Sequence, residues 1–275
     1  MKRDEVKQLI DRGLRELNEA LAAGKSDRLK QYLDVMARFP RYSLNNCILI
    51  AIQRPDATMV QGFHAWKKLG RCVTKGEKGI GIIAPMVGRK QDDAGSEDIS
   101  VFGFKVVHVF DVSQTEGDAL PEFTKVKGDP GRNVGAIEAY IQSEGIELCY
   151  EVIPSGANGV SKNGKIIIDP ELDPASRLRV LVHELAHEHL HWPEARGKQT
   201  TKMVRETEAE AVASVVCQAL GLDTLEHCAD YIQLYNGDAE ILAKSMEHIQ
   251  KTAAKILEGI NAHTSTDATS QELAA

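Results

Sequence analysis

Two histidines and a glutamate in one short segment have the spacing of a metal-dependent hydrolase. The segment HELAH places His183 and His187 four residues apart, with Glu184 beside the first histidine. On a helix, residues four apart lie on one face, so both imidazoles can bind a single zinc ion. A carboxylate at the position of Glu184 can take a proton from water that the zinc activates. The spacing therefore predicts His183 and His187 as zinc ligands and Glu184 as the catalytic base.

A catalytic zinc site needs a third protein ligand. His191 lies too far along the same helix to reach the ion comfortably, and the metzincin pattern HExxHxxGxxH is absent. The later segment RETEAEAVASVV, residues 205–216, offers a glutamate from a second helix. Glu206 and Glu210 share one face of that helix. We predict Glu206 as the third ligand, and Glu210 as the acceptor of a hydrogen bond from the free ring nitrogen of a ligand histidine.

These residues also have a plain structural interpretation. The histidines can be satisfied polar groups of an ordinary helix, and the acidic residues can form a solvated face. The apolar residues around the histidines favour the zinc site, because imidazole and carboxyl groups in a largely apolar helix need a buried partner. Glu208 points away from Glu206 and Glu210 and is expected at the surface. His189 and His191 are expected just outside the zinc site or exposed to solvent.

Three helices are expected to position this site. Asp173 and Pro174 suit the N-cap and the first position of a helix that continues to about His191. Two further helices are expected at about 202–220 and 238–260. A helix at 134–143 and short strands at 148–153 and 165–170 precede them, which predicts a small α+β region before the zinc helices.

The amino-terminal half is expected to combine helices with strands. Apolar residues at three- and four-residue spacing predict helices over about 6–21, 29–39 and 44–52, followed by a short helical turn that Gly70 closes. The glycine-rich turn KGEKG leads into the β-branched run at 80–83, and we expect a β-hairpin there. Residues 88–99 are expected to form a loop before a strand at 101–110.

Composition indicates a globular protein whose charge is unevenly distributed. The 275 residues are 43% hydrophobic and 27% charged, which suits two modest domains. The net charge of -7 would argue against nucleic acid if it were evenly spread. Residues 36–90, however, carry +8, and the rest of the chain carries -15. The two parts are therefore expected to face different electrostatic partners.

The same composition bears on location. The chain has no apolar stretch of the roughly 18 residues that a membrane span requires, and Asp4 and Glu5 do not suit a secretion signal. The five cysteines include no CxxC pair, so neither a disulfide framework nor a thiolate zinc site is indicated. We expect a cytoplasmic protein without a membrane partner.

The basic window resembles a single-stranded nucleic-acid surface in composition. Such surfaces combine a basic groove with aromatic rings on which unstacked bases lie. The window interleaves aromatic residues with lysines and arginines, and the candidates for DNA contact are Tyr42, Trp66, Lys67, Lys68, Arg71, Lys75 and Lys78. The alternative is that the aromatic rings belong to the core and that the lysines form a solvated rim.

Several segments together resemble a known family. HELAHEHLH followed by the E-x-E-A-E pattern resembles the ImmA/IrrE type of zinc metallopeptidase domain, in the version found in ArdC-like antirestriction proteins. RYSLNNCILI, GFHAWKKLGR and VTKGEKGIGIIAP are similar to the single-stranded-DNA-binding domain of those proteins, and the resemblance covers about residues 36–260. It implies His183, His187 and Glu206 as the zinc ligands. The sequence departs from the family at Glu210, where Asn often stands.

The combined prediction is an α+β protein with a helical and β amino-terminal single-stranded-DNA-binding domain and a mainly helical, gluzincin-like zinc metallopeptidase domain. The expected boundaries are 1–120 for the first domain, 121–133 for a linker, 134–262 for the second domain and 263–275 for a flexible tail. The predicted function is peptide hydrolysis in an antirestriction protein of mobile DNA, on an unidentified protein substrate. Tyr231 is a candidate oxyanion stabiliser. The alternative is a DNA-protecting interaction factor with structural zinc or vestigial peptidase activity.

Overall fold

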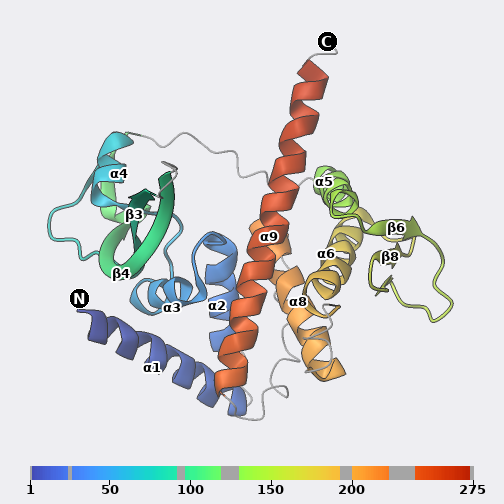
Figure 1. The fold of residues 1–275 in the computed structure, drawn as a ribbon, viewed down its shortest axis with the longest axis horizontal. Coiled ribbons are helices and arrows are strands. Elements are labelled where there is room, and N and C mark those ends of the chain that lie inside the picture. Colours follow the sequence, from blue (N-terminus) through green and yellow to red (C-terminus); the bar gives the residue numbers. More distant parts are fainter. Residues whose placement is uncertain are drawn as a thin grey trace. The chain divides into compact units, whose positions relative to one another are not determined.

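The computed structural model describes residues 2–23, 27–91, 97–118, 130–192, 200–222 and 239–272. The chain divides into two compact units, of which unit 1 comprises Met1–Glu16 and Leu44–Pro121, and unit 2 comprises Leu17–Ser43 and Glu122–Ala275. Unit 1 combines helices with two small antiparallel sheets, and unit 2 is mainly helical with one small sheet (Figure 1). The α+β class predicted from the sequence is therefore confirmed.

Unit 1 is built around a long β-ribbon. Its elements are the first part of α1 (Arg3–Ala22), α3 (Leu44–Gln53), β1 (Val60–Gly62), α4 (Phe63–Lys68), β2 (Arg71–Val73), β3 (Ile80–Gln91), β4 (Glu97–Asp111) and β5 (Thr115–Gly117). β4 lies between β1 and β3 and is antiparallel to both. Val6 and Ile10 of α1 and Leu49 of α3 form an apolar cluster, against which Ile83 and Val106 of the sheet pack.

The strand pairing corrects two predictions. The strands on either side of the glycine-rich turn 75–79 do not pair with each other, because β2 pairs with β5 and β3 pairs with β4. The predicted loop at 88–99 is also wrong in part, since β3 continues to Gln91 and β4 begins at Glu97. The physical reason is length: β4 offers β3 many more backbone hydrogen bonds than the three-residue β2.

Two amide side chains of α3 pair with the edge of β3. Asn46 donates to the carbonyl of Ile83 and accepts from its N–H, both at 2.9 Å. Gln53 makes the same two bonds with Gly81, also at 2.9 Å. Because β3 is an edge strand, its outer N–H and C=O groups would otherwise lack partners in the sheet. The two amides therefore pair with the backbone of β3 as a neighbouring strand would, and they hold α3 against the sheet.

Unit 2 packs its helices around the segment with the two histidines. Its elements are α2 (Asp27–Arg38), α5 (Pro130–Ser143), β6 (Glu147–Tyr150), β7 (Gly159–Ser161), β8 (Lys165–Ile168), α6 (Pro174–Leu190), α8 (Lys202–Ala219) and α9 (Ala239–Glu272). β8 is the central strand, parallel to β6 and antiparallel to β7. α6 packs against α5, α8 and β7, and α8 packs against α2, α6 and α9. The three predicted zinc-domain helices are thus present.

The two units can be compared with the expected domain boundaries. The division after Pro121 falls at the start of the predicted linker 121–133, most of which lies outside the described residues. Residues 17–43, assigned from the sequence to domain 1–120, cluster with unit 2 because α2 packs on α8. α9 remains helical to Glu272, within the segment 263–275 that was expected as a tail.

None of the described helices is both long and apolar enough to cross a bilayer.

Candidate metal centre and nucleic-acid surface

Helix α6 begins with strong local signals. The Asp173 carboxylate accepts hydrogen bonds from the N–H groups of Ala175 at 3.0 Å and Ser176 at 3.1 Å, and Pro174 occupies the first helical position. This N-cap satisfies backbone donors that a helix start leaves free. The helix then runs without interruption through both histidines. Their four-residue spacing therefore becomes a shared face.

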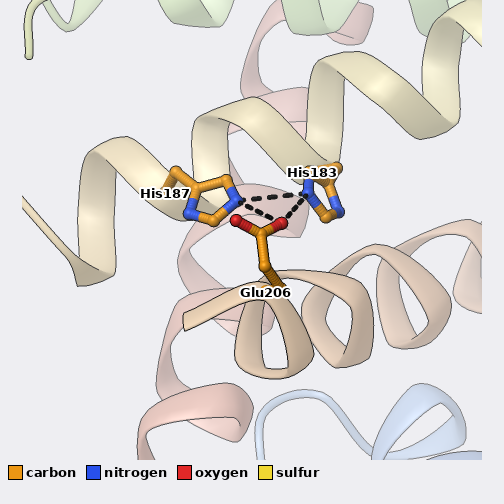
Figure 2. A group of neighbouring side chains, drawn as sticks. All are labelled: His183, His187 and Glu206. Atoms are coloured by element: carbon orange, nitrogen blue, oxygen red, sulfur yellow. Dashed lines mark hydrogen bonds and ion pairs between the residues drawn. The ribbon is translucent and has the colours of Figure 1, made fainter. Parts of the chain in front are cut away.

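Helix α8 supplies the third side chain of the cluster. It begins at the N-cap Thr201, whose hydroxyl accepts from the N–H of Val204. Glu206, in the second turn, points at the two imidazoles of α6 (Figure 2). Its Oε2 lies 3.6 Å from His183 Nε2 and 3.5 Å from His187 Nε2, and the two Nε2 atoms are 3.2 Å apart. The structure thus brings the three predicted ligands together.

The three donor atoms fit a tetrahedral metal ion. Ligand atoms about 2.0–2.1 Å from zinc in a tetrahedron lie about 3.3–3.4 Å from one another. The three observed separations span 3.2 to 3.6 Å. Two imidazole nitrogens and one carboxylate oxygen also form the donor set that a catalytic zinc site uses, with the fourth position left open. The arrangement therefore suits a divalent cation such as zinc.

The charges in the cluster are strongly coupled. Hydrogen bonds from His183 and His187 hold the pKa of Glu206 well below its ordinary value. Burial alone would lower the pKa of His183, but Glu206 and Glu210 raise it to about 9. In the absence of a metal, the Glu206 carboxylate therefore attracts positive charge. A divalent cation can satisfy that attraction in place of protons.

Glu184 lies between the cluster and strand β7. Its side chain is buried, and burial raises its pKa while the two histidines oppose that rise. The backbone of Ser161, on β7, also opposes the rise in the pKa of Glu184. Gly159 faces it from the same strand, close enough that a Cβ there would lie 2.9 Å from Glu184 Oε1. The glycine therefore leaves the space that the carboxyl group occupies.

Strand β7 is fastened to α6 by a second glutamate. Glu188 accepts from the Ser161 hydroxyl at 2.5 Å and from the Gly164 N–H at 2.7 Å. The indole N–H of Trp192 also donates to the Ser161 oxygen, at 2.6 Å. These bonds fix the edge strand beside the metal cluster.

A cavity of about 810 Å³ opens at this point of unit 2. Its lining includes the three metal-cluster residues, Glu184, β7 and Trp192, with Lys202 and Arg205 at the start of α8. A volume of this size is in the range that binds small molecules or a few residues of a peptide. Glu184 and the open side of the metal cluster therefore face a space that a substrate can enter.

The imidazoles are held from behind by further polar side chains. Glu210 Oε2 lies 3.4 Å from His183 Nδ1, and its other oxygen pairs with Arg179, which matches the predicted contact of Glu210 with a ligand histidine. His187 Nδ1 lies 2.9 Å from His191 Nδ1, so His191 adjoins the cluster. His189 instead stacks against Tyr140, away from the three ligands.

The expected surface position of Glu208 is wrong. Its side chain is 0% exposed, lies 3.0 Å from His191 Nε2 and accepts a hydrogen bond from Ser245 of α9. The reason is that α8 is covered by α2, α6 and α9 rather than by one neighbour. Sequence reasoning placed only one face of this helix in the interior. The candidate oxyanion stabiliser Tyr231 lies outside the described residues.

The candidate DNA-contact residues fall into different environments. Trp66 is 0% exposed and donates its indole N–H to the carbonyl of Phe110 at 2.8 Å, so its ring packs in the core of unit 1 and offers no face to a base. Arg71 is bonded to Thr115 and ties β2 to β5. Tyr42 is half-buried in unit 2. The exposed candidates are all in unit 1: Lys67, Lys68, Lys75 and Lys78.

Three exposed phenylalanines of unit 1 were not among the candidates. Phe63 is 51% exposed at the start of α4, and Phe102 and Phe104 of β4 are 69% and 55% exposed. Lys105, next to Phe104, is exposed as well. The sequence signal was the run VFGFK, which places aromatic residues beside a lysine just beyond the basic window. Phe102 and Phe104 are two residues apart on β4 and so share one face of the strand, and grouped rather than single exposed apolar residues are typical of a contact surface.

Comparisons with known proteins agree with this architecture. Residues 3–110 match the family described as the N-terminal domain of anti-restriction factor ArdC. An uncharacterized protein of Bacillus anthracis is 25% identical over an alignment that covers 94% of this chain, and the chain spans about half (52%) of that protein's length.

Solved structures extend the likeness beyond the amino-terminal region. The metal-free crystal structure of antirestriction ArdC from the R388 plasmid is similar with a TM-score of 0.55 at 19% identity, over 94% of this chain and 98% of that one. Its Mn(II)-bound crystal structure gives a TM-score of 0.54 at 18% identity, over 93% and 98%. Residues 3–110 are therefore similar to the N-terminal domain of anti-restriction factor ArdC, and the chain shares the ArdC fold over most of its length.

Proposed function

We propose that unit 2 is a zinc-dependent peptidase. The observation that carries the proposal is the convergence of His183, His187 and Glu206 within 4.8 Å of one another, at a cavity that Glu184 also lines. A purely structural metal site has no use for a buried carboxylate beside its open position. Glu184 therefore favours catalysis over structural metal binding.

The side chains have distinct roles in this proposal. A bound zinc ion would polarise the substrate carbonyl and activate water. Glu184 takes the proton of the attacking water and later delivers it to the leaving amine. The space left by Gly159 accommodates that carboxyl group. β7 is an edge strand of its sheet, so an extended peptide can pair beside it.

The identity of the metal is part of the proposal. Mn(II) in a structure of ArdC supports a divalent cation in this fold. Two imidazoles and one carboxylate in a tetrahedral spacing favour zinc, because manganese prefers more oxygen ligands and octahedral geometry.

We further propose that unit 1 binds single-stranded DNA. Support comes from residues 44–90, the part of the basic window that lies in unit 1, with eight Lys/Arg against two Asp/Glu, and from the exposed lysines of α4 and of the 75–79 turn and the exposed phenylalanines. Because Trp66 is buried, we assign base stacking to Phe63, Phe102 and Phe104 instead. Together with the peptidase, this activity suits a protein that accompanies mobile DNA during antirestriction.

A second candidate function is DNA protection without proteolysis. The ArdC match of residues 3–110 favours it, since that family is described by its anti-restriction role alone. In this case the metal would be structural or the peptidase activity vestigial. The two candidates differ in whether any protein is cut.

The peptidase proposal is tested with the purified full chain. Zinc content is measured by mass spectrometry, and cleavage of unfolded casein is followed with and without oligo(dT). About one zinc per chain is expected, lost in His183→Ala. Glu184→Gln should keep the zinc and lower cleavage by about 10²-fold or more, because the base is removed while the ligands remain. Zinc retention by His183→Ala, or no cleavage by the zinc-loaded wild type under either condition, would overturn the proposal.

The DNA proposal is tested by the salt dependence of oligo(dT) binding. Replacing both Lys67 and Lys68 by Ala should flatten the slope of log affinity against log salt by about 1.4, since each single-strand phosphate contact contributes about 0.7. Exchanging Lys162 and Lys251 of unit 2 for Ala changes the net charge equally and serves as the matched control. Equal effects of the two double variants would assign binding to overall charge rather than to this surface.

A further inference from the structure

A chain of polar side chains continues from the metal cluster into the interior of unit 2. His187 Nδ1 lies 2.9 Å from His191 Nδ1, and His191 Nε2 lies 3.0 Å from Glu208 Oε2. The Ser245 hydroxyl donates to the other oxygen of Glu208, at 2.5 Å. The members come from α6 and its C-cap His191, then from α8 and α9. The chain therefore links one proposed metal ligand to two further helices.

The tautomer of His187, the proposed metal ligand, fixes which nitrogens of this chain carry protons. His187 presents Nε2 to the other two donors of the cluster. A neutral imidazole that binds a metal through Nε2 carries its proton on Nδ1. That proton is donated to Nδ1 of His191, so the proton of His191 is on Nε2 and is donated to Glu208. Each nitrogen and oxygen of the chain then has a partner of the opposite kind.

The polar side chains of this chain are buried. His191 is 6% exposed, Glu208 0% and Ser245 3%. Burying a carboxyl and an imidazole is unfavourable unless hydrogen bonds compensate. The hydrogen bonds among these side chains and to the ring of His187 contribute to that compensation. Apolar side chains of similar size would fill the same space, so the presence of polar ones indicates a role in orienting the ring of His187.

We infer that His191, Glu208 and Ser245 form a positioning chain, which holds His187 in the Nδ1–H tautomer with Nε2 aimed at the metal. The inference rests on the proposed metal site. It assigns to Glu208 and His191 the role that a single carboxylate usually has behind a metal-bound histidine. It also makes the metal affinity depend on α9, which carries no ligand of the cluster.

Zinc affinity, measured by competition with a chromogenic chelator, tests the chain without reference to activity. His191→Leu removes the acceptor for the His187 proton and should weaken zinc binding about 10- to 100-fold. Glu208→Gln should also weaken it, by less, because an amide oxygen still accepts from His191. His189→Leu is the matched control, since it makes the same change two residues away on α6, outside the chain.

Two further measurements keep the test decisive if a variant folds poorly. Ser245→Ala removes only a hydroxyl at the far end and should weaken zinc binding measurably, with the far-ultraviolet circular dichroism spectrum unchanged. In the wild-type zinc protein, long-range proton–nitrogen NMR should report the Nδ1–H tautomer for His187 and the Nε2–H tautomer for His191. The opposite tautomer at His191 would overturn the inference.

The outcomes separate this inference from the proposed function. A wild-type chain that binds zinc in a manner dependent on His183, while His191→Leu and Ser245→Ala bind it equally well, overturns the positioning chain alone. A wild-type chain that binds no zinc overturns the metal site, and the inference falls with it.

Discussion

Gly159→Ala is expected to disable the proposed catalytic carboxylate, Glu184, without touching a proposed metal ligand. A Cβ at this position of β7 would lie 2.5 Å from Val180 Cγ1 and 2.9 Å from both Cγ and Oε1 of Glu184. Non-bonded carbon atoms normally approach to about 3.5–4.0 Å. Either β7 or the Glu184 side chain must therefore yield by about 1 Å, and β7 is itself fastened by the hydrogen bonds of Ser161 and Gly164 to Glu188.

The size of the effect follows from that displacement. A misplacement of about 1 Å at a reacting group costs on the order of 10²-fold in rate. Overpacking of this kind also costs about 1–3 kcal/mol of stability. Zinc binding should be retained, because Gly159 approaches Glu184 and Val180 rather than the ligands. Loss of cleavage with retained zinc is therefore the expected signature.

The assay compares casein cleavage, zinc content and the urea unfolding midpoint of the full chain. Gly135→Ala is the matched control in the same unit, because no atom lies within 4 Å of a Cβ at that position of α5. It should leave cleavage unchanged and raise stability by up to about 1 kcal/mol, since Ala is the better helix former. A Gly159→Ala protein that cleaves casein at the wild-type rate would refute the assignment of the glycine to the space around Glu184.

Three further predictions concern unit 1, with hydrogen exchange of the β3 and β4 amides as the common measure of its stability. Trp66→Phe should destabilise the unit by about 1–3 kcal/mol, because a buried carbonyl loses its donor, and should leave oligo(dT) affinity unchanged. Asn46→Ala should cost a similar amount by exposing the β3 edge, whereas Asn45→Ala, at an exposed position beside it, should be neutral. Burial alone would raise the pKa of Asp111, but four hydrogen bonds hold it below its ordinary value of 3.8. Its stabilisation is therefore present above that pH and lost as the pH falls through the lowered value, and Asp111→Asn should remove this part of the acid sensitivity.

The metal cluster could be predicted because its geometry is mostly local. A four-residue spacing fixes two imidazoles on one helical face wherever the helix lies. The start of α6 was equally readable, since the N-cap and first-turn residues act within a few positions. Glu206 could be predicted as the third residue of the cluster because it shares a helical face with Glu210. Only its approach to α6 depended on the tertiary fold.

The environments of the candidate DNA-contact residues could not be predicted with the same success. Composition shows that aromatic and basic residues are close in sequence, but it does not show which aromatic rings are buried in the core. Trp66 is buried because its indole N–H finds a carbonyl 44 residues later, on β4. The pairing of β2 with β5 has the same origin, since it joins segments more than 40 residues apart. These features depend on long-range contacts that a local pattern does not contain.

Glu208 shows how a local rule fails when its premise is wrong. Helical periodicity correctly places it opposite Glu206 and Glu210, but equating that side with solvent assumes a helix with one buried face. The residues that follow, from Ala209 to Cys217, are almost all small and apolar around the whole circumference, which is typical of a helix buried on every side. In such a helix, a carboxyl group that faces away from the metal cluster must meet another helix. Glu208 meets Ser245 of α9 and His191, the C-cap of α6, and these contacts lead back to His187.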